Sequence, residues 1–205
     1  MDHNVTSVVE GLNLFDVITA DRLVAKISSE HPLVGNIPSV TFQGTSFENL
    51  RIAGRPINLT LDLDICDQGS GRGYPSQPTI TDERFLARVA EQYGRMNDAN
   101  NLPAWVRDRA VPDWIKERYS PEIVQAGKDG SVAVSVVKET DGEFPGRPFG
   151  NVFEVPGLGR VFLGELLVNA QSYHLSTLRV ELRGRVHGHF GGPNSGANGA
   201  TYPPG

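Results

Sequence analysis

The strongest constraint on the fold of this chain is the alternation of apolar and polar side chains along residues 57–64. The apolar positions are Ile57, Leu59, Leu61 and Leu63, and the polar ones are Asn58, Thr60, Asp62 and Asp64. A period of two residues is typical of a β-strand that buries one face and exposes the other. Shorter runs of this kind occur at residues 22–28, 132–136, 161–167 and 178–182. The sequence therefore predicts strands in both its first and its last third, with a turn at residues 53–56 joining residues 47–52 to the alternating run as a hairpin.

The period changes between these strand regions. The apolar residues with helical spacing are Phe85, Leu86, Val89, Ala90 and Tyr93. Residues 81–83 carry a Thr-Asp-Glu helix start. Pro103 and Pro112 precede residues 104–109 and 113–119, which predicts two further short helices. We interpret residues 67–127 as a helical insertion that packs over an edge or an end of the sheet.

These elements predict one mainly β domain over residues 1–205, an antiparallel β-sandwich of jelly-roll type with a central helical insertion. Two separate domains would each have too few strands for a core. A β-solenoid is the rival architecture, but no fixed repeat length occurs. Residues 191–205 form a Gly/Pro-rich tail, which we interpret as a linker, a disordered end or a segment ordered against a partner.

Composition narrows the possible partners. The net charge of -5 argues against nucleic acid as the main partner, since binding phosphates requires a basic surface. No apolar stretch approaches the ~20 residues of a membrane helix, and the first 17 residues lack the pattern of a signal peptide. Cys66 is the single cysteine, which excludes an intramolecular disulfide and leaves it the role of a small residue at a strand end.

Three stretches of the sequence carry turn motifs that suggest a family. Residues 11–25 contain a Thr-Ala-Asp turn, residues 44–54 begin with Gly-Thr-Ser-Phe, and residues 151–165 contain Pro-Gly-Leu-Gly. Together they resemble the choice-of-anchor type of bacterial surface or secreted β domain. The resemblance implies an extracellular or cell-surface β domain of unassigned activity, and it assigns no functional residue. The chain differs from the pattern in its central insertion and in lacking an export signal and a sorting anchor.

Two groups of residues are candidate metal ligands. Asp62, Asp64 and Asp67 are closely spaced before Gly69, which suggests a calcium loop, although the EF-hand pattern is not met. The alternative is that Asp62 and Asp64 are outward residues of a strand and Asp67 starts a turn. His187 and His189 lie two residues apart, so on a strand both imidazoles share a face. A zinc or copper site there needs a further ligand such as His174, and solvated side chains are the alternative.

Aromatic residues of the insertion are candidate binding residues: Tyr93, Trp105, Trp114 and Tyr119. Such residues either fill the joint between helix and sheet or serve as interface anchors. Glu165 interrupts the apolar face between Leu163 and Leu167. A buried carboxylate requires a partner or a raised pKa, and we expect a structural ion pair with Arg179 if a bulge turns the strand.

No nucleophile elbow, P-loop or dinucleotide-binding motif occurs in the sequence. We therefore expect a non-enzymatic structural or interaction protein whose partner is a second copy of itself or another protein. Self-association would use exposed strand edges or the tail. The alternatives are a glycan- or calcium-binding module, and then a hydrolase with two carboxylates from distant parts of the chain.

Overall fold

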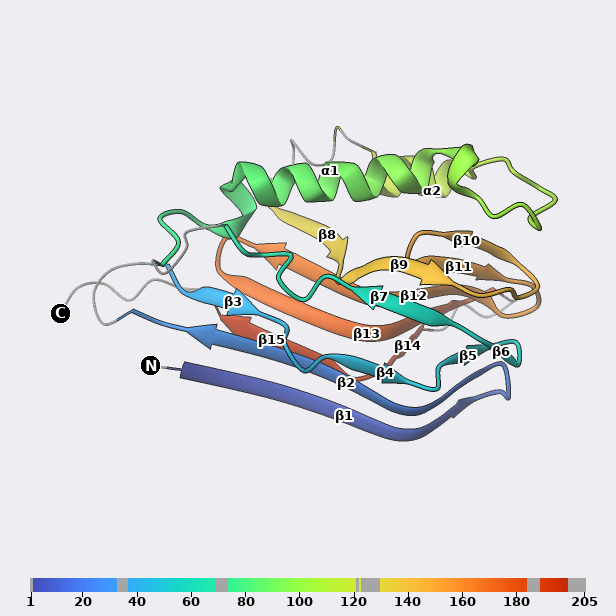
Figure 1. Cartoon of the computed structure of the whole chain (residues 1–205), viewed down its shortest axis with the longest axis horizontal. Coiled ribbons are helices and arrows are strands. Elements are labelled where there is room, and N and C mark those ends of the chain that lie inside the picture. Colours follow the sequence, from blue (N-terminus) through green and yellow to red (C-terminus); the bar gives the residue numbers. More distant parts are fainter. Residues whose placement is uncertain are drawn as a thin grey trace.

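A computed structural model of the chain describes residues 2–32, 37–68, 74–120, 122, 130–183 and 189–198. It confirms a mainly β fold in which antiparallel sheets pack as a sandwich (Figure 1). Within the described ranges, no helix is long and apolar enough to cross a membrane.

The first sheet is built around a long hairpin of β1 and β2. Its strands are β1 (Asp2–Leu14), β2 (Ile18–Glu30), β3 (Ser39–Thr41), β4 (Ser46–Glu48), β5 (Arg51–Ile52) and β6 (Arg55–Pro56). β2 pairs with β1 along its length and also with β3, β4 and β5. The buried side chains of β2 therefore form the inner face of this sheet.

The second sheet is built around the hairpin of β12 and β13. Its strands are β8 (Ser131–Ser135), β10 (Arg147–Phe149), β11 (Val152–Val155), β12 (Gly159–Asn169), β13 (Ser172–Leu182), β14 (His189–Gly191) and β15 (Asn194–Asn198). β12 pairs with β11 and β8, and β13 pairs with β14 and β15. A small sheet joins β7 (Asn58–Leu61) to β9 (Val137–Asp141), which follows β8 directly.

A tight hairpin forms around residues 53–54, but the predicted pairing of residues 47–52 with the alternating run is wrong. The turn joins β5 to β6, and Ala53 and Gly54 both have positive φ. The alternating strand that follows, β7, pairs with β9 from the second half of the chain. The alternation identified a half-buried strand, but it carries no information on which edge the strand joins.

Helices occupy the middle of the chain: η1 (Thr79–Thr81), α1 (Glu83–Asn97), η2 (Ala99–Asn101) and α2 (Asp113–Arg118). α1 begins where the sequence predicted, because the Asp82 carboxylate accepts a hydrogen bond from the Phe85 backbone N–H at 2.9 Å. The helix predicted at residues 104–109 is absent. The Arg109 guanidinium donates instead to the carbonyls of Ala99, Leu102 and Pro103, which holds this segment as an irregular turn.

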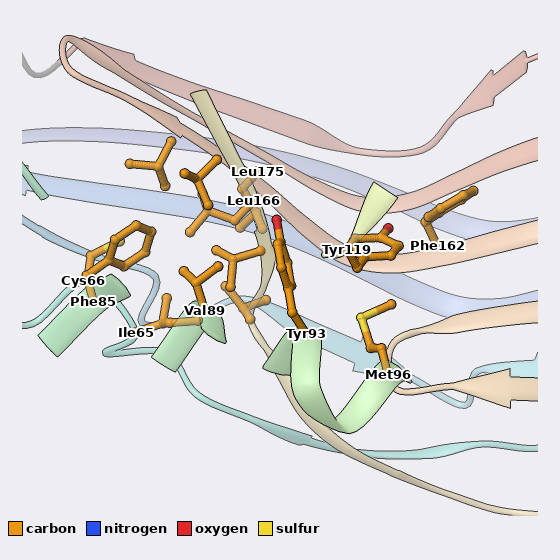
Figure 2. Close-up of a cluster of buried hydrophobic side chains, with 14 of the residues drawn as sticks. Ile65, Cys66, Phe85, Val89, Tyr93, Met96, Tyr119, Phe162, Leu166 and Leu175 are labelled. Carbon is orange, nitrogen blue, oxygen red and sulfur yellow. The ribbon is translucent and has the colours of Figure 1, made fainter. Parts of the chain in front are cut away.

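α1 is part of the core and not an addition to a finished sandwich. It lies on the side of the molecule opposite β1 (Figure 1). Its buried side chains Phe85, Val89 and Tyr93 lie close to Leu166 of β12 and Leu175 of β13 (Figure 2). The same buried cluster reaches Ala25 and Ile27 of β2 and the β8 valines Val132 and Val134. α1 and the two sheets therefore share one apolar interior.

A second buried cluster joins the two large sheets directly. Its members include Ile18, Leu23 and Ile52 from the first sheet and Phe153, Val161, Leu178 and Val180 from the second. Each of these side chains is almost completely removed from water. Strands from both ends of the chain thus pack around a common core, as the sequence predicted.

A buried glutamine fastens α1 to the passage between β8 and β9. The Gln92 side-chain amide donates to the carbonyls of Ser135 (3.1 Å) and Val137 (3.4 Å), and its oxygen accepts from the Ser135 N–H (2.8 Å). These backbone groups lie where the chain leaves one sheet for the other. Gln92 thus provides hydrogen bonds that a neighbouring strand would otherwise supply.

Part of the predicted Gly/Pro-rich tail is a strand. β15 pairs with β13 from Ser172↔Asn198 to Ser176↔Asn194. The buried Ser195 hydroxyl donates to the Ala25 carbonyl of β2 at 2.7 Å. This part of the tail is ordered against its own chain, while residues 199–205 lie outside the described residues.

Replacing Phe85 by Ala should lower the free energy of unfolding by roughly 3–5 kcal/mol, because it empties a buried site between α1 and the sheets. Urea unfolding followed by tryptophan fluorescence measures the change. The control is Glu91→Ala, an exposed position of α1 that should stay within about 0.5 kcal/mol of the wild type. Small losses in both variants would contradict a core role for α1.

Candidate functional site

Strand β1 leaves one edge without a partner strand. In the described part of the chain β1 pairs with β2 and with no other strand. Alternate backbone N–H and C=O groups of β1 therefore point away from the sheet. Gly11, with φ of 63°, interrupts the extended backbone near the turn, so residues 2–10 form the regular part of this edge. We call this row of outward backbone groups the β1 edge.

The β1 edge lacks the lysines and prolines by which proteins commonly block edge strands. Residues 2–14 contain no Lys, Arg or Pro, and their only charged side chains are Asp2 and Glu10. Val5 and Val8 are large apolar residues with exposed fractions of 39% and 42%. The edge is therefore long, weakly charged and partly apolar.

An exposed aromatic ring lies at the turn that ends β1. Phe15 and Asp16 both have φ of 56°, and the Leu14 carbonyl accepts from the Val17 N–H at 3.0 Å, as in a type I′ turn. Asn13 holds the turn by exchanging two hydrogen bonds with Asp16. The left-handed region favours Gly or Asn over Phe, yet the Phe15 side chain is 66% exposed. No packing that the structure describes explains a phenylalanine here.

Phe15→Gly should raise the free energy of unfolding by about 1 kcal/mol, because glycine removes the steric cost of a left-handed backbone. Phe15→Ala is the matched control: it removes the ring but keeps the Cβ atom, so no gain is expected. Thermal unfolding of both variants makes the comparison. A loss of stability on Phe15→Gly would show that the ring packs against the protein.

A row of alternating charge crosses four strands of the second sheet. Arg147 of β10 is the register partner of Glu154 of β11, which is the partner of Arg160 of β12, which is the partner of Glu181 of β13. We call these four residues the charged row. Direct cross-strand neighbours lie on the same face of a sheet, and opposite charges there attract.

Arg147 and Glu154, the first pair of the charged row, form a hydrogen-bonded ion pair. Arg147 donates to the Glu154 carboxylate through Nε (2.8 Å) and Nη2, and to Asp108 through Nη1 (2.7 Å). The Trp114 indole N–H of α2 donates to the other Glu154 oxygen at 2.9 Å. The Arg160 guanidinium stacks on the Trp114 ring at 3.9 Å. Trp114 thus contacts both Glu154 and Arg160 of the charged row.

Glu165 and Arg179 continue this network on β12 and β13. Arg179 donates to both Glu165 oxygens, at 2.6 and 2.8 Å, and to Glu181 at 2.5 Å. Arg118 of α2 also contacts both carboxylates. The expected Glu165–Arg179 ion pair is confirmed, and the preceding Gly164 has the positive φ (59°) of an irregular strand position.

The arginines control the ionisation of Glu181. Burial by itself raises the pKa of this carboxyl, but the hydrogen bond and charge of Arg179, with the charges of Arg118 and Arg160, outweigh that effect. The net result is a pKa below the ordinary value. Glu181 is therefore a structural anion at neutral pH, which does not suit it as a proton donor in catalysis.

A pocket of about 590 Å³ opens beside the charged row. All four residues of the row line it. Asp108, Val155, Pro156, Leu182 and Arg183 also line it. The pocket therefore combines both signs of charge with an apolar wall.

Glu181→Gln should lower the free energy of unfolding at pH 7. The difference in this free energy between wild type and variant should shrink as the pH falls. The pKa of Glu181 is lower in the folded than in the unfolded protein, so its ionised form stabilises the fold at any pH above the unfolded-state pKa. This stabilisation is lost as the pH falls through the folded-state pKa. Urea unfolding of wild type and variant between pH 7 and about pH 3 tests this. A difference that stays constant over this range would contradict the ion-pair network.

The three aspartates proposed as a calcium loop make separate contacts. Asp62 lies 3.7 Å from Arg88, and the Asp64 carboxylate accepts from Gln43. Asp67 donates its N–H to the Asp64 carbonyl at 2.8 Å and so closes a turn that begins at residue 64. In the alternative interpretation Asp67 started the turn and Asp62 and Asp64 lay on a strand, but β7 ends at Leu61. Across the described ranges, no group of three or more His, Cys, Asp or Glu side chains is placed to hold a metal ion.

The histidines proposed as metal ligands are only partly covered by the structure. His187 lies outside the described residues. The backbone of His189 is in β14, where its register partner is Glu181. The metal proposal for this pair stays a prediction.

The four candidate binding aromatics take core or joint positions. Tyr93 and Tyr119 are buried, with edge-to-face rings 5.3 Å apart, and burial raises the pKa of Tyr93 to about 12. Trp105 packs on Phe144, and Trp114 covers the charged row. Burial also raises the pKa of the Cys66 thiol, so it is a poor nucleophile.

Sequence reasoning missed the charged row and the β1 edge. The row's members are scattered over residues 147–181, and only the strand register brings them together. For the edge, the available signal was the absence of Lys, Arg and Pro in residues 2–14, but a strand's place at the edge of a sheet is a tertiary property.

Comparison with known proteins gives a family without an assigned activity. The sequence profile of DUF8256, described as a domain of unknown function, matches residues 2–169. This range ends with β12, so β13, β14 and β15 lie outside it. No curated protein and no solved structure matches the chain.

Proposed function

We propose that this protein is a non-enzymatic assembly module that joins copies of itself through the β1 edge. The chain belongs to the DUF8256 family of domains of unknown function. The observation that carries the proposal is a 13-residue strand with one edge unpaired among the described residues. Exposed edges of this kind take up further strands through backbone hydrogen bonds.

A second copy is the partner that fits this edge with the fewest assumptions. Two β1 strands placed antiparallel around a two-fold axis present the same groups to each other, which is the commonest symmetry of soluble oligomers. The extended strand spans roughly 40 Å at the usual rise per residue, so pairing even part of it forms a continuous sheet across two molecules.

The side chains beside the edge support the same role. Val5 and Val8 point to opposite faces of the strand, and a paired strand would cover part of each side chain, which favours association. The exposed Phe15 ring at the end of the hairpin is of the type that interfaces use as an anchor. We further propose an extracellular or bacterial surface location, which the resemblance to choice-of-anchor domains implies.

Val8→Lys should shift the protein toward monomer, because two lysine side chains introduced at a paired edge repel each other and replace apolar contact. Light scattering coupled to size-exclusion chromatography, over a concentration series, measures the molar mass. The wild type should show a mass above that of the 22.3 kDa chain, rising with concentration.

Leu167→Lys is the matched control. Leu167 is 39% exposed, close to Val8, but its strand is paired on both sides, with β13 and β8. This variant should associate like the wild type. A wild type that stays monomeric at every concentration, or a Val8→Lys variant with wild-type mass, would overturn the proposal.

A further inference from the structure

The pocket beside the charged row contains three carboxylates, but other groups of the chain already bind them. Glu154 accepts from Arg147 and from the Trp114 indole. Glu181 accepts from Arg179 and Arg118. The third carboxylate, Asp108, accepts from Arg147. The negative charges of the pocket are therefore neutralised by arginines before any ligand arrives.

Two guanidinium groups in the same pocket keep donors available. Arg160 makes one long hydrogen bond, from Nη1 to Glu181 at 3.4 Å, and otherwise stacks on Trp114. Arg183 is exposed, and its side chain has no acceptor among the described residues. Arg183 lies two residues beyond Glu181, the register partner of Arg160, and its N–H donates to the Leu158 carbonyl. Diagonal neighbours at this spacing are within reach of long side chains.

The charge balance indicates room for a single negative charge. The pocket lining itself carries three positive and three negative charges, from Arg147, Arg160 and Arg183 and from Asp108, Glu154 and Glu181. The network behind it adds Arg118, Arg179 and Glu165, which leaves one positive charge in excess. The excess of one positive charge occurs in a chain whose net charge is -5. Such a local excess matches a carboxylate better than a doubly charged phosphate.

The remaining pocket surface can contact the body of a ligand. Val155, Pro156 and Leu182 supply apolar contacts, and carboxylate oxygens of the row have lone pairs that hydroxyl groups can reach. A volume of about 590 Å³ lies within the range of small-molecule sites. A ring that carries hydroxyls and one carboxylate satisfies the donors, the acceptors and the apolar wall together.

We propose that this pocket binds a carboxylated sugar of the uronic acid class, with Arg160 and Arg183 holding its carboxylate. The site is separate from the β1 edge, and the two proposals stand or fall independently. The Val8→Lys variant should therefore bind the sugar as the wild type does.

Trp114 provides a reporter inside the molecule. Its indole N–H donates to Glu154 and its ring stacks on Arg160, so a ligand on Arg160 changes its surroundings. Neither tryptophan lines the pocket, but Trp105 packs on Phe144 and makes no hydrogen bond or ring contact with Arg160 or Glu154 among the described residues. In nitrogen–proton NMR spectra, titration with glucuronate should shift the Trp114 indole signal saturably and leave that of Trp105 unchanged. Glucose, acetate and inorganic phosphate should bind at least about tenfold more weakly.

Arg183→Gln should weaken glucuronate binding at least about tenfold, since it removes a charged donor from an exposed position where folding is not at stake. Arg55→Gln, an exposed arginine of β6 outside the pocket lining, is the matched control and should bind like the wild type. If Arg183→Gln bound glucuronate as tightly as Arg55→Gln does, the proposal would be overturned. Equal binding of glucose or of phosphate would overturn the assigned ligand class.

Discussion

The structure depends above all on the pairing of β12 with β13. This hairpin supplies the edges on which β8, β11, β14 and β15 are placed. One set of its side chains, including Val161, Leu178 and Val180, packs against the first sheet. Another, with Leu166 and Leu175, meets α1. Because so many elements contact these two strands, weakening their pairing would affect both buried clusters at once.

The same hairpin explains how charge is organised on the protein. Its register places Arg160 beside Glu181 and brings Arg179 within reach of Glu165. Neighbouring strands then extend the alternation to Glu154 and Arg147. These ion pairs are partly buried and share hydrogen bonds with Trp114 and Arg118, which distinguishes them from isolated surface pairs of little energetic value. They fix α2 above the sheet and shape the pocket.

The sequence carried the local structure well and the long-range pairing poorly. Alternation at residues 57–64 identified β7, and the spacing of Phe85, Val89 and Tyr93 identified α1. The charge of Glu165 on an otherwise apolar strand face indicated an ion pair with Arg179. Each of these signals is local or depends on the cost of burying a charge. The partner of β7, the turn held by Arg109 and the ordering of residues 194–198 on β13 depend on contacts between distant segments. No periodicity encodes such contacts.

The β1 edge is the feature on which the functional account rests, and amide hydrogen exchange tests it most directly. Exchange rates of residues 2–10 should be compared at low and high protein concentration. If copies join through this edge, the amides directed away from β2 become protected at high concentration, while those bonded to β2 are slow at both. Rapid exchange of the outward amides at every concentration would contradict the account.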